Sequence, residues 1–167
     1  MTLPATVREA LVSDAEAFNT CHIACWREAY ATLWGAERLD ELDEAALADT
    51  RRTEIAEGIA RHMLAERDGE VIGVAIAGPS RDDNPPTELE LYAIYVRAAH
   101  YGTGVSTLLL DAVLRGEAAS LWTYRDSPRA SAFYVNQGFI PDGSEKKDAA
   151  GILTLRMVRR DSPARHA

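Results

Sequence analysis

The segment from Glu88 to Gly116 joins three patterns in a fixed order, and this order constrains the fold more than any other feature of the chain. Glu88 to Val96 alternates with a period of two, which predicts a strand. Gly102 and Gly104 follow, and two glycines so close together let the backbone turn tightly. Val105 to Val113 then carries an apolar stripe at helical spacing. A strand that feeds a helix in this way predicts a crossover helix packed on a sheet.

Local signals predict the other elements. Asp68-Gly69 suits a tight hairpin turn between strands at Arg61–Arg67 and Glu70–Ala77, because both turn positions favour positive φ. Ser13 and Glu16 form a capping-box pattern ahead of an apolar helix. Further strands are predicted at Thr6–Ala10, Ser120–Tyr124, Ile140 and Leu153–Val158, and further helices within Glu44–Ile59 and from Ser127-Pro128 to Gly138. Together they predict an α/β (α+β) fold, a mixed sheet with helices on both faces.

Size and composition exclude several classes. A chain of 167 residues predicts one domain, which we expect over residues 1–158, with a flexible tail at 159–167. The longest near-apolar stretch, Val71 to Gly78, is far short of the roughly 20 residues of a membrane helix. Two cysteines cannot form a disulfide framework, which favours a cytoplasmic location. The net charge of −8 argues against nucleic acid as a partner and suits a cationic one.

The Gly102-x-Gly104 turn is a candidate phosphate site. Free amides at the start of a helix favour an anion such as a pyrophosphate. A dinucleotide fingerprint would need a third glycine at Thr107, and the Gly-Lys-Ser/Thr of a nucleotide-triphosphate loop is absent. A plain strand-to-helix turn remains the alternative.

Cys21-His22-x-x-Cys25 is the one arrangement that suggests a metal. Its three ligands lie on one helix and lack a fourth partner, and both cysteines fall on the apolar stripe of that helix. The sequence therefore predicts packed thiols and no metal.

Three segments resemble one family. They are Glu90-Leu91-Tyr92-Ala93-Ile94-Tyr95-Val96, the Gly102-x-Gly104 turn, and Ala130-x-x-Phe133-Tyr134-x-x-x-Gly138-Phe139. Together they resemble the GNAT superfamily of acyl-CoA-dependent N-acetyltransferases, in the right order along nearly the whole chain. The resemblance implies a GNAT-like fold, with a splayed, mostly antiparallel sheet that opens between the strands ending at Val96 and Tyr124.

The resemblance also implies where acetyl-CoA binds. The pantetheine arm would bond the backbone of Ile94 and Val96, and the pyrophosphate would rest on the turn. The implied cofactor-binding residues are Ile94, Tyr95, Val96, Tyr101, Gly102, Thr103, Gly104, Val105, Ser106, Ser127 and Tyr134. Tyr101 and Ser106 depart from the family, whose loop usually has Gln or Arg at the first of these positions and Gly or Ala at the second.

The chemistry of amine acetylation requires two further roles, a general base and a general acid. An amine that is protonated at neutral pH needs a general base, and Glu90 matches a glutamate that serves this role in some relatives. Glu88 shares the predicted face and is the second candidate. Either carboxylate could instead be paired with an arginine or solvated. Tyr134 would donate a proton to the leaving thiolate, although a partly buried structural tyrosine has the same pattern.

These observations predict an N-acetyltransferase that acts on a primary amine of a small cationic acceptor. A peptide or protein amine is the alternative acceptor, and a CoA-binding module with little turnover is the alternative function. A partner-binding dimer is a third possibility, in which an apolar edge strand at Leu153–Val158 pairs across a two-fold axis. Tyr30, Trp34, Tyr92 and Trp122 are candidates for the walls of the acceptor pocket.

Overall fold

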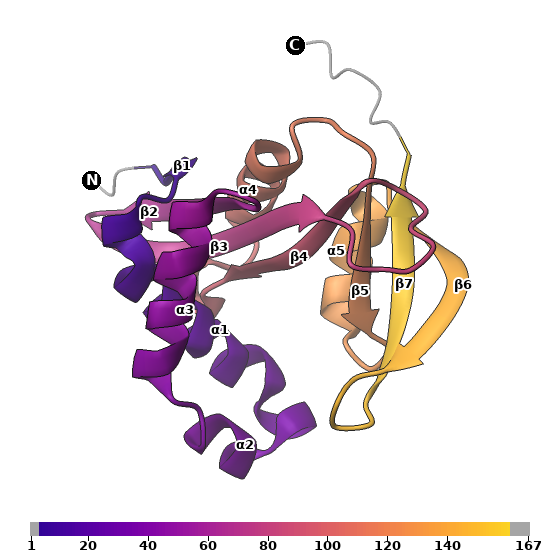
Figure 1. Ribbon diagram of the computed structural model, residues 1–167, viewed down its shortest axis with the longest axis horizontal. Helices are drawn as coiled ribbons and strands as arrows, with labels where there is room; N and C mark the ends of the chain where they lie inside the picture. The colour runs from indigo at the N-terminus through magenta and orange to yellow at the C-terminus, as the bar shows by residue number, and fades with distance from the viewer. Residues whose placement is uncertain (1–3, 161–167) are drawn as a thin grey trace. The chain divides into compact units, whose positions relative to one another are not determined.

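The structure is a computed structural model that describes residues 4–160 (Figure 1). The elements follow one another as β1 (Thr6–Glu9), a 3-10 turn (Val12–Asp14), α1 (Ala15–Trp34), α2 (Ala36–Asp40), α3 (Glu44–Glu57), β2 (Arg61–Arg67), β3 (Glu70–Pro79), β4 (Leu89–Val96), a 3-10 turn (Ala98–His100), α4 (Val105–Leu114), β5 (Ala119–Tyr124), α5 (Pro128–Asn136), β6 (Ile140–Lys147) and β7 (Leu153–Arg159). The strands form a mostly antiparallel sheet in the order β1-β2-β3-β4-β5-β7-β6, in which β4 and β5 are parallel. This arrangement confirms the predicted fold class.

The described chain forms two compact units. Unit 1 comprises residues 4–76 and 93–113, and unit 2 comprises residues 77–92 and 114–160. The strands β3 and β4 therefore each begin in one unit and end in the other. The predicted turn and the strand end that precedes it belong to unit 1, whereas Glu90 and Tyr134 belong to unit 2.

Helices cover both faces of the sheet in unit 1. Consecutive residues of a strand point to opposite faces. The His62 ring of β2 meets the Phe18 ring of α1 edge to face, with 5.6 Å between centroids. The preceding residue, Arg61, donates from Nη1 to the carbonyl of Val113 in α4 at 3.0 Å. Helices α1 and α4 therefore lie on opposite sides of β2 (Figure 1).

Gly73 of β3 allows α4 to approach the sheet closely. A Cβ on Gly73 would lie 2.8 Å from Leu109 Cδ1 and 3.1 Å from the carbonyl oxygen of Tyr95. Leu109 is fully buried, so its side chain has little freedom to move away. Only glycine fits at this position, and the close contact fixes α4, and with it the turn before α4, against the sheet.

The first helix begins differently from the prediction. A 3-10 turn at Val12–Asp14 comes first, and Ser13 does not cap α1. Asp14 Oδ2 instead accepts the backbone N–H of Leu11 at 2.7 Å and pairs with Arg8 Nη1 at 2.8 Å. The hydrogen bond with Arg8 lowers the pKa of Asp14. Ser13 lies inside the 3-10 turn and Asp14 is the residue before α1, so the predicted capping box is wrong.

In unit 2, β7 is an interior strand. It pairs with β5 from Ala119↔Arg159 to Tyr124↔Thr154 and with β6 on its other side. The prediction of an edge strand at Leu153–Val158 is therefore wrong, because the polar segment that follows Ile140 forms β6 rather than a loop. Arg159 is the last residue of β7 and is 5% exposed, so it does not belong to a flexible tail; residues 161–167 of the predicted tail lie outside the described residues.

The parallel pairing of β4 with β5 consists of Leu89↔Ala119, Glu90↔Ser120 and Leu91↔Leu121. We expect β4 and β5 to separate beyond these pairs, toward Val96 and Tyr124, and this separation stays a prediction. Helix α2 and the long strand β6 were not predicted from the sequence, whereas the Asp68-Gly69 turn has the predicted positive φ angles, 52° and 79°.

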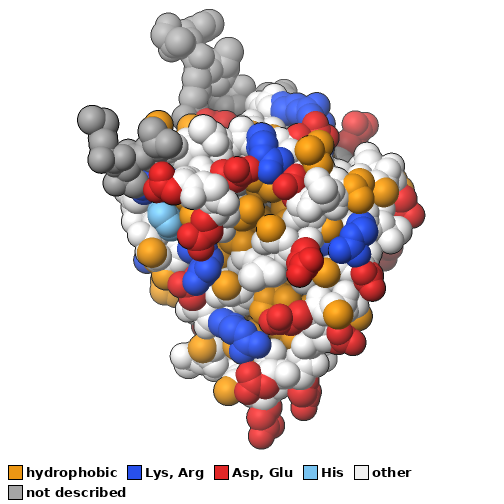
Figure 2. All heavy atoms as spheres, turned by 90° about the vertical axis from the view of Figure 1, so that its left-hand side faces the viewer, with side chains coloured by type: hydrophobic (Ala, Val, Ile, Leu, Met, Phe, Trp, Pro, Cys, Tyr) orange, Lys and Arg blue, Asp and Glu red, His pale blue; other side chains and the backbone are white. Residues whose placement is uncertain are grey.

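One side of unit 1 carries charges of both signs. Figure 2 shows acidic and basic side chains interspersed over it, with acidic ones at its lower end. The exposed residues Glu37, Asp40 and Glu41 of the α2 segment supply acidic groups in unit 1. None of the helices in the described part of the chain is long and apolar enough to cross a membrane.

Candidate active site

The turn between β4 and α4 is open and depends on glycine. Gly102 has a φ of +75° and Gly104 a φ of +89°, in the left-handed region that other residues rarely adopt. Apart from the adjacent residues, no described atom lies within 4 Å of the place that a Cβ would take at either glycine. The Thr103 hydroxyl donates to the His100 carbonyl at 2.6 Å and braces the turn. The backbone is therefore accessible to a ligand.

The chemistry of this turn suits an anionic ligand. Helix α4 begins at Val105, and the first amides of an α-helix have no acceptor within the helix. Residues 97–106 include Arg97 and His100 but no acidic side chain. His100 Nδ1 is buried and has no hydrogen-bond partner among the described residues. The Tyr101 amide already donates to the Ala98 carbonyl at 3.1 Å, and the Glu28 carboxylate accepts the Ala98 amide at 3.2 Å. An anion at this turn would therefore depend on the amides at the start of α4.

The strand end that precedes the turn offers only its backbone. Ile94 and Val96 are 9% and 5% exposed. The Tyr95 side chain turns to the face of α1, where its hydroxyl lies 3.0 Å from that of Tyr30. Burial raises the pKa of Tyr95, so its phenol stays neutral at physiological pH. Any contact of these three residues with a pantetheine arm would therefore use main-chain groups.

Glu90 of β4 is buried and paired with Arg81 from the loop after β3. Only 2% of its surface is exposed. Its Oε1 accepts the backbone N–H of Arg81 at 3.0 Å, and its Oε2 accepts Nε of the same residue at 3.2 Å and also Nη2. The arginine pair, which the sequence leaves open as one environment for this carboxylate, is present in the structure, whereas the role of Glu90 as a base stays a prediction.

Glu88 lies in a different environment. The strand begins one residue later, at Leu89, so Glu88 belongs to the loop and is exposed. Its backbone carbonyl accepts the N–H of Ser80 at 2.8 Å. The two carboxylates are therefore distinct, one buried and paired and the other in contact with water.

Tyr134 is half-buried on α5. Its ring meets Phe139 edge to face at 5.9 Å and Phe133 at 5.6 Å between centroids. Ser127 precedes the helix and Pro128 is its first residue, as predicted, but the Ser127 side chain makes no capping hydrogen bond. A serine before a helix that begins with proline is expected to cap it, and this expectation is wrong for Ser127, although its place at the start of α5 is confirmed.

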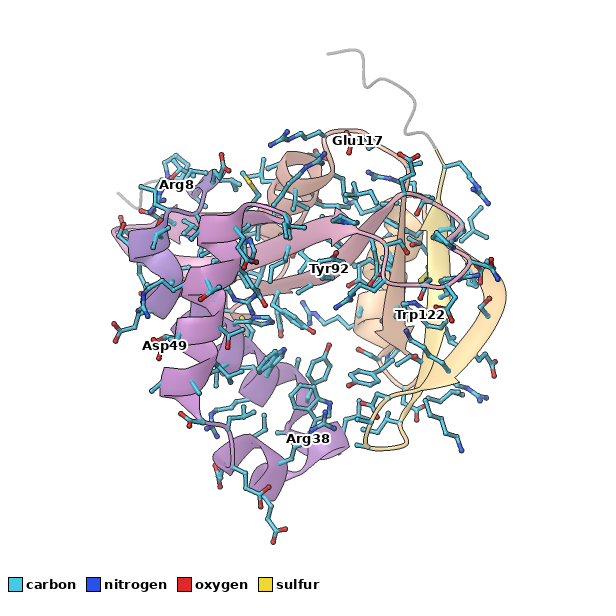
Figure 3. The ribbon with its side chains drawn as sticks, in the orientation of Figure 1. Arg8, Arg38, Asp49, Tyr92, Glu117 and Trp122 are labelled. Atoms are coloured by element: carbon cyan, nitrogen blue, oxygen red, sulfur yellow. The ribbon has the colours of Figure 1, made fainter. Side chains whose placement is uncertain are left out.

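The aromatic residues that the sequence offers as pocket walls fall into two clusters. In unit 1, Tyr30 stacks on Trp34 at 4.8 Å, and the Arg38 guanidinium lies 4.2 Å above the Trp34 ring. In unit 2, Tyr92 lies on β4 and Trp122 on β5 (Figure 3). The Trp122 ring has the Lys146 Nζ 4.1 Å from its centroid, so rings of both units lie beside a cation of their own unit.

A buried cluster in unit 1 was not anticipated from the sequence. Arg51 of α3 reaches His22 Nδ1 and His62 Nε2, each at 3.4 Å, and donates to Glu54 at 2.7 Å. Burial, together with the charge of Arg51, lowers the pKa of His22 to about 3 and also lowers that of His62. Both rings are therefore neutral acceptors at physiological pH. Three residues so far apart in sequence give no local signal of such a cluster.

We expect this cluster to make the fold sensitive to acid. The unfolded chain protonates His22 near its ordinary pKa of 6.5, whereas the folded chain does so near 3. The contribution of His22 to the free energy of unfolding is therefore complete above pH 6.5. It is lost as the pH falls toward about 3, at up to about 1.4 kcal/mol per pH unit. Urea unfolding at several pH values within this window should show a flatter pH dependence for His22→Gln than for the wild type. The matched control is His100→Gln, and a His22→Gln slope equal to that of the wild type would contradict the assignment.

Cys21 and Cys25 are free thiols buried on α1, as predicted. A hydrogen bond between Cys25 and Cys21, together with burial, raises the pKa of Cys25, which keeps it a neutral thiol rather than a nucleophile. Within residues 4–160, no group of three or more His, Cys, Asp or Glu side chains is placed to hold a metal ion.

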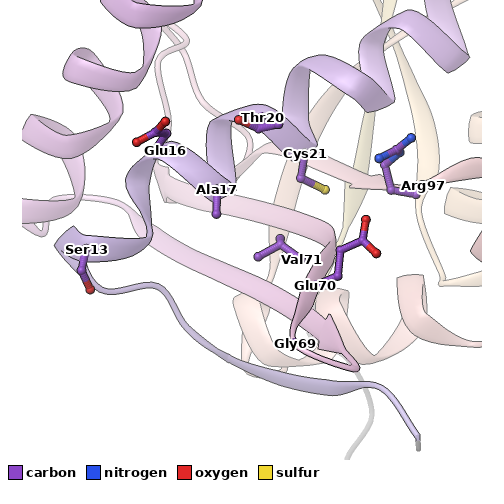
Figure 4. A pocket seen from close by; sticks show the side chains of 9 residues that line it. All are labelled: Ser13, Glu16, Ala17, Thr20, Cys21, Gly69, Glu70, Val71 and Arg97. Carbon is purple, nitrogen blue, oxygen red and sulfur yellow. The ribbon is translucent and has the colours of Figure 1, made fainter. Parts of the chain in front are cut away.

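A groove of about 500 Å³ opens in unit 1 between the start of α1 and the β2–β3 hairpin (Figure 4). Its lining residues are Ser13, Glu16, Ala17, Thr20, Cys21, Gly69, Glu70, Val71 and Arg97. Arg97 already pairs with Glu28 at 2.7 Å. The groove combines charges of both signs and was not predicted by any of the sequence motifs.

Comparisons with known proteins agree with the fold. The chain is 36% identical over 83 residues to the mycothiol acetyltransferase of Nocardia farcinica, which covers 48% of this chain and 26% of that protein. It is 29% identical over 105 residues to the uncharacterized N-acetyltransferase YuaI of Bacillus subtilis. That match covers 63% of this chain and 60% of YuaI. The chain thus spans less than two thirds of the length of both curated relatives.

A solved structure shares the fold over nearly the whole chain. The PaiA N-acetyltransferase of Thermoplasma acidophilum, determined in complex with coenzyme A, superposes with a TM-score of 0.70 over 96% of this chain and 100% of its own, at 14% identity. The model of the acetyltransferase (GNAT) domain matches residues 30–160. Because this match covers most of the sequence, the chain belongs to the GNAT acetyltransferase family.

Proposed function

We propose that the protein is an N-acetyltransferase that transfers an acetyl group from acetyl-CoA to a primary amine. The observation that carries the proposal is the open, two-glycine turn at the start of α4, in a chain of the GNAT acetyltransferase family. Acetyl-CoA, when bound, supplies the acetyl group as a thioester. The amides of residues 101–106 would bind its pyrophosphate, and main-chain groups of Ile94–Val96 would orient its pantetheine arm. Ser127, at the start of α5, completes the proposed cofactor-binding residues with Tyr134.

The acceptor must lose a proton before it attacks. An alkyl ammonium has a pKa near about 10, so nearly all of it is charged at neutral pH. A carboxylate can take the proton directly or through water, and we assign this role to Glu90, with Glu88 as the second candidate. The burial of Glu90 supports the choice, because a carboxylate sheltered from water interacts more strongly with a cation.

The leaving thiolate needs a proton in turn. We assign this role to the hydroxyl of Tyr134, since a phenol can donate a proton or a hydrogen bond to a sulfur that gains negative charge. The rings of Phe133 and Phe139 limit the movement of Tyr134 on α5.

The acceptor class follows from charge. The net charge of −8 and the Glu88 and Glu90 carboxylates favour a small cationic amine over a neutral one. A peptide amine is the alternative acceptor, and a CoA-binding module without turnover is the alternative function, to which the engagement of Glu90 by Arg81 gives some support. We also propose a cytoplasmic location, in keeping with the two free thiols.

The two candidate bases can be separated by mutation. We expect Glu90→Gln to lower kcat/KM, with the largest loss at low pH, where an ammonium is hardest to deprotonate. Glu88→Gln should have the smaller effect, because its exposed carboxylate is screened by water. Steady-state rates against pH for the two variants provide the test. A larger loss in Glu88→Gln would assign the base to Glu88.

The experiment that tests the proposal is a thiol-release screen with acetyl-CoA against a panel of cationic, zwitterionic and neutral amines. We expect release only when an amine is present, and faster release with cationic members. Tight binding of acetyl-CoA with no release for any amine would support the binding module instead.

A further inference from the structure

The starting point is the unequal exposure of the two partners in the Arg81–Glu90 pair. The Glu90 side chain is 2% exposed, whereas that of Arg81 is 62% exposed. The guanidinium therefore lies between the carboxylate and the solvent. It covers Glu90 rather than being buried with it.

The Arg81 guanidinium also packs on an aromatic ring. The carbon Cζ of Arg81 lies 3.9 Å from the centroid of the Tyr92 ring. The Tyr92 hydroxyl donates to the carbonyl of Pro79, which fixes the ring at the root of the loop. A carboxylate on one side and an aromatic face on the other are the two groups that recognise alkyl ammonium and guanidinium ions.

Ser120 adds a hydroxyl that the protein does not use. It is the partner of Glu90 in the parallel β4–β5 pairing, and paired positions share a face of the sheet. Ser120 is fully buried, and its Oγ has no hydrogen-bond partner among the described residues. Such groups in a folded protein are nearly always satisfied, so an unused hydroxyl beside Glu90 indicates a missing partner.

We propose that Glu90, Tyr92 and Ser120 form the binding site for the cationic group of the acceptor, and that Arg81 is its intramolecular occupant. This inference rests on the proposed function for the identity of the ligand as an acceptor. The guanidinium side chain must leave Glu90 before an external cation binds there. The apparent affinity for that cation is then reduced by the fraction of molecules in which Arg81 is in place.

The surrounding contacts allow the side chain to leave without unfolding the loop. The next residue, Asp82, accepts Trp122 Nε1 at 3.0 Å and pairs with Arg156 Nη1 at 3.2 Å. The bond from the Arg81 backbone N–H to Glu90 Oε1 involves no guanidinium nitrogen, so it does not require the side chain to stay in place. Rotation of one exposed side chain therefore suffices to open the site.

The test measures cation binding to the whole chain in the absence of acetyl-CoA. Propylguanidinium and propylammonium are titrated calorimetrically into the wild type and into Arg81→Gln, with propylurea as the neutral probe. We expect Arg81→Gln to bind the two cations at least about tenfold more tightly than the wild type, because the internal competitor is gone. Propylurea should show no gain, and the double variant Arg81→Gln/Glu90→Gln should lose the gain.

The matched control is Arg52→Gln, which removes a guanidinium from an exposed ion pair with Asp49 on α3. It should leave cation binding unchanged. If Arg81→Gln does not fold alone, recovery of a cooperative thermal transition on addition of propylguanidinium supports the site, and no recovery overturns it. Equal cation affinity in the wild type and a folded Arg81→Gln also overturns it and leaves Arg81 as a structural partner.

Failure of the two proposals can be told apart. Tighter cation binding by Arg81→Gln with no acetyl transfer to any amine would contradict the proposed function while supporting the cation site. Acetyl transfer by the wild type with no gain in cation binding would do the reverse.

Discussion

Replacing Gly104 by valine is expected to abolish the binding of acetyl-CoA while the protein remains folded. The space where the side chain would stand is free of described atoms, so the valine meets no part of the protein. It would instead project into the place that the pyrophosphate is expected to take. A branched residue at a φ of +89° is strained, which costs of the order of 1–2 kcal/mol of stability.

Gly143→Val is the matched control for this experiment. Gly143 has the same φ of +89° and equally open surroundings, but it lies on β6 in unit 2. The two variants should lose similar stability in urea unfolding, whereas calorimetric titration should show loss of acetyl-CoA binding only in Gly104→Val. Normal affinity in a folded Gly104→Val would remove the turn from the binding site.

Replacing Tyr134 by phenylalanine is expected to lower kcat by about 10²-fold or more, the usual range for loss of a general acid. The ring and its edge-to-face contact with Phe139 are retained, so the packing of α5 should not change. The affinity for acetyl-CoA should fall little, because the hydroxyl acts on the leaving sulfur rather than on the bound thioester. Single-turnover rates together with calorimetric affinities separate the two effects.

Tyr124→Phe provides the comparison. The Tyr124 hydroxyl donates to Asp148 at 2.7 Å, so this variant also removes one phenolic hydroxyl from unit 2. We expect it to reduce stability and to leave kcat close to that of the wild type. If Tyr134→Phe retained the wild-type rate, or if the two variants lost rate equally, Tyr134 would not be the acid.

Elements with a local signal were predicted well. The β2–β3 hairpin depends on one dipeptide, Asp68-Gly69, whose positive φ angles are present. The β4 strand, the glycine turn and α4 follow from residue spacing within a few positions of each other. The start of α5 follows from Ser127-Pro128, although the serine side chain does not cap it.

Elements that depend on distant partners were missed. β6 is polar and carries an irregularity between Pro141 and Glu145, so its strand character comes from pairing with β7 rather than from its own sequence. That pairing also places β7 in the interior, which the apolar pattern of Leu153–Val158 alone does not reveal. Helix α2 has five residues, too few to show helical spacing.

The candidate site likewise has parts with a local sequence signal and parts that depend on residues distant in sequence. The turn residues are contiguous, so two glycines are enough to predict a binding turn there, and its role stays a prediction. The sequence offered an arginine partner for Glu90 only as an alternative and did not specify which arginine. Arg81 precedes Glu90 by nine residues and reaches it through a loop whose course no sequence pattern specifies. The Arg51–His22–His62 cluster joins α3, α1 and β2 and gave no signal for the same reason.

The central claim is that an acetyl carbon moves from sulfur to nitrogen on this protein. Incubation with acetyl-CoA labelled with ¹³C in the acetyl group and a cationic primary amine, followed by mass spectrometry of the amine, tests this directly. We expect one labelled acetyl group on the amine nitrogen for each CoA thiol released, and loss of this product in Gly104→Val. Thiol release without labelled amine, or bound acetyl-CoA that stays intact with every amine offered, would contradict the account.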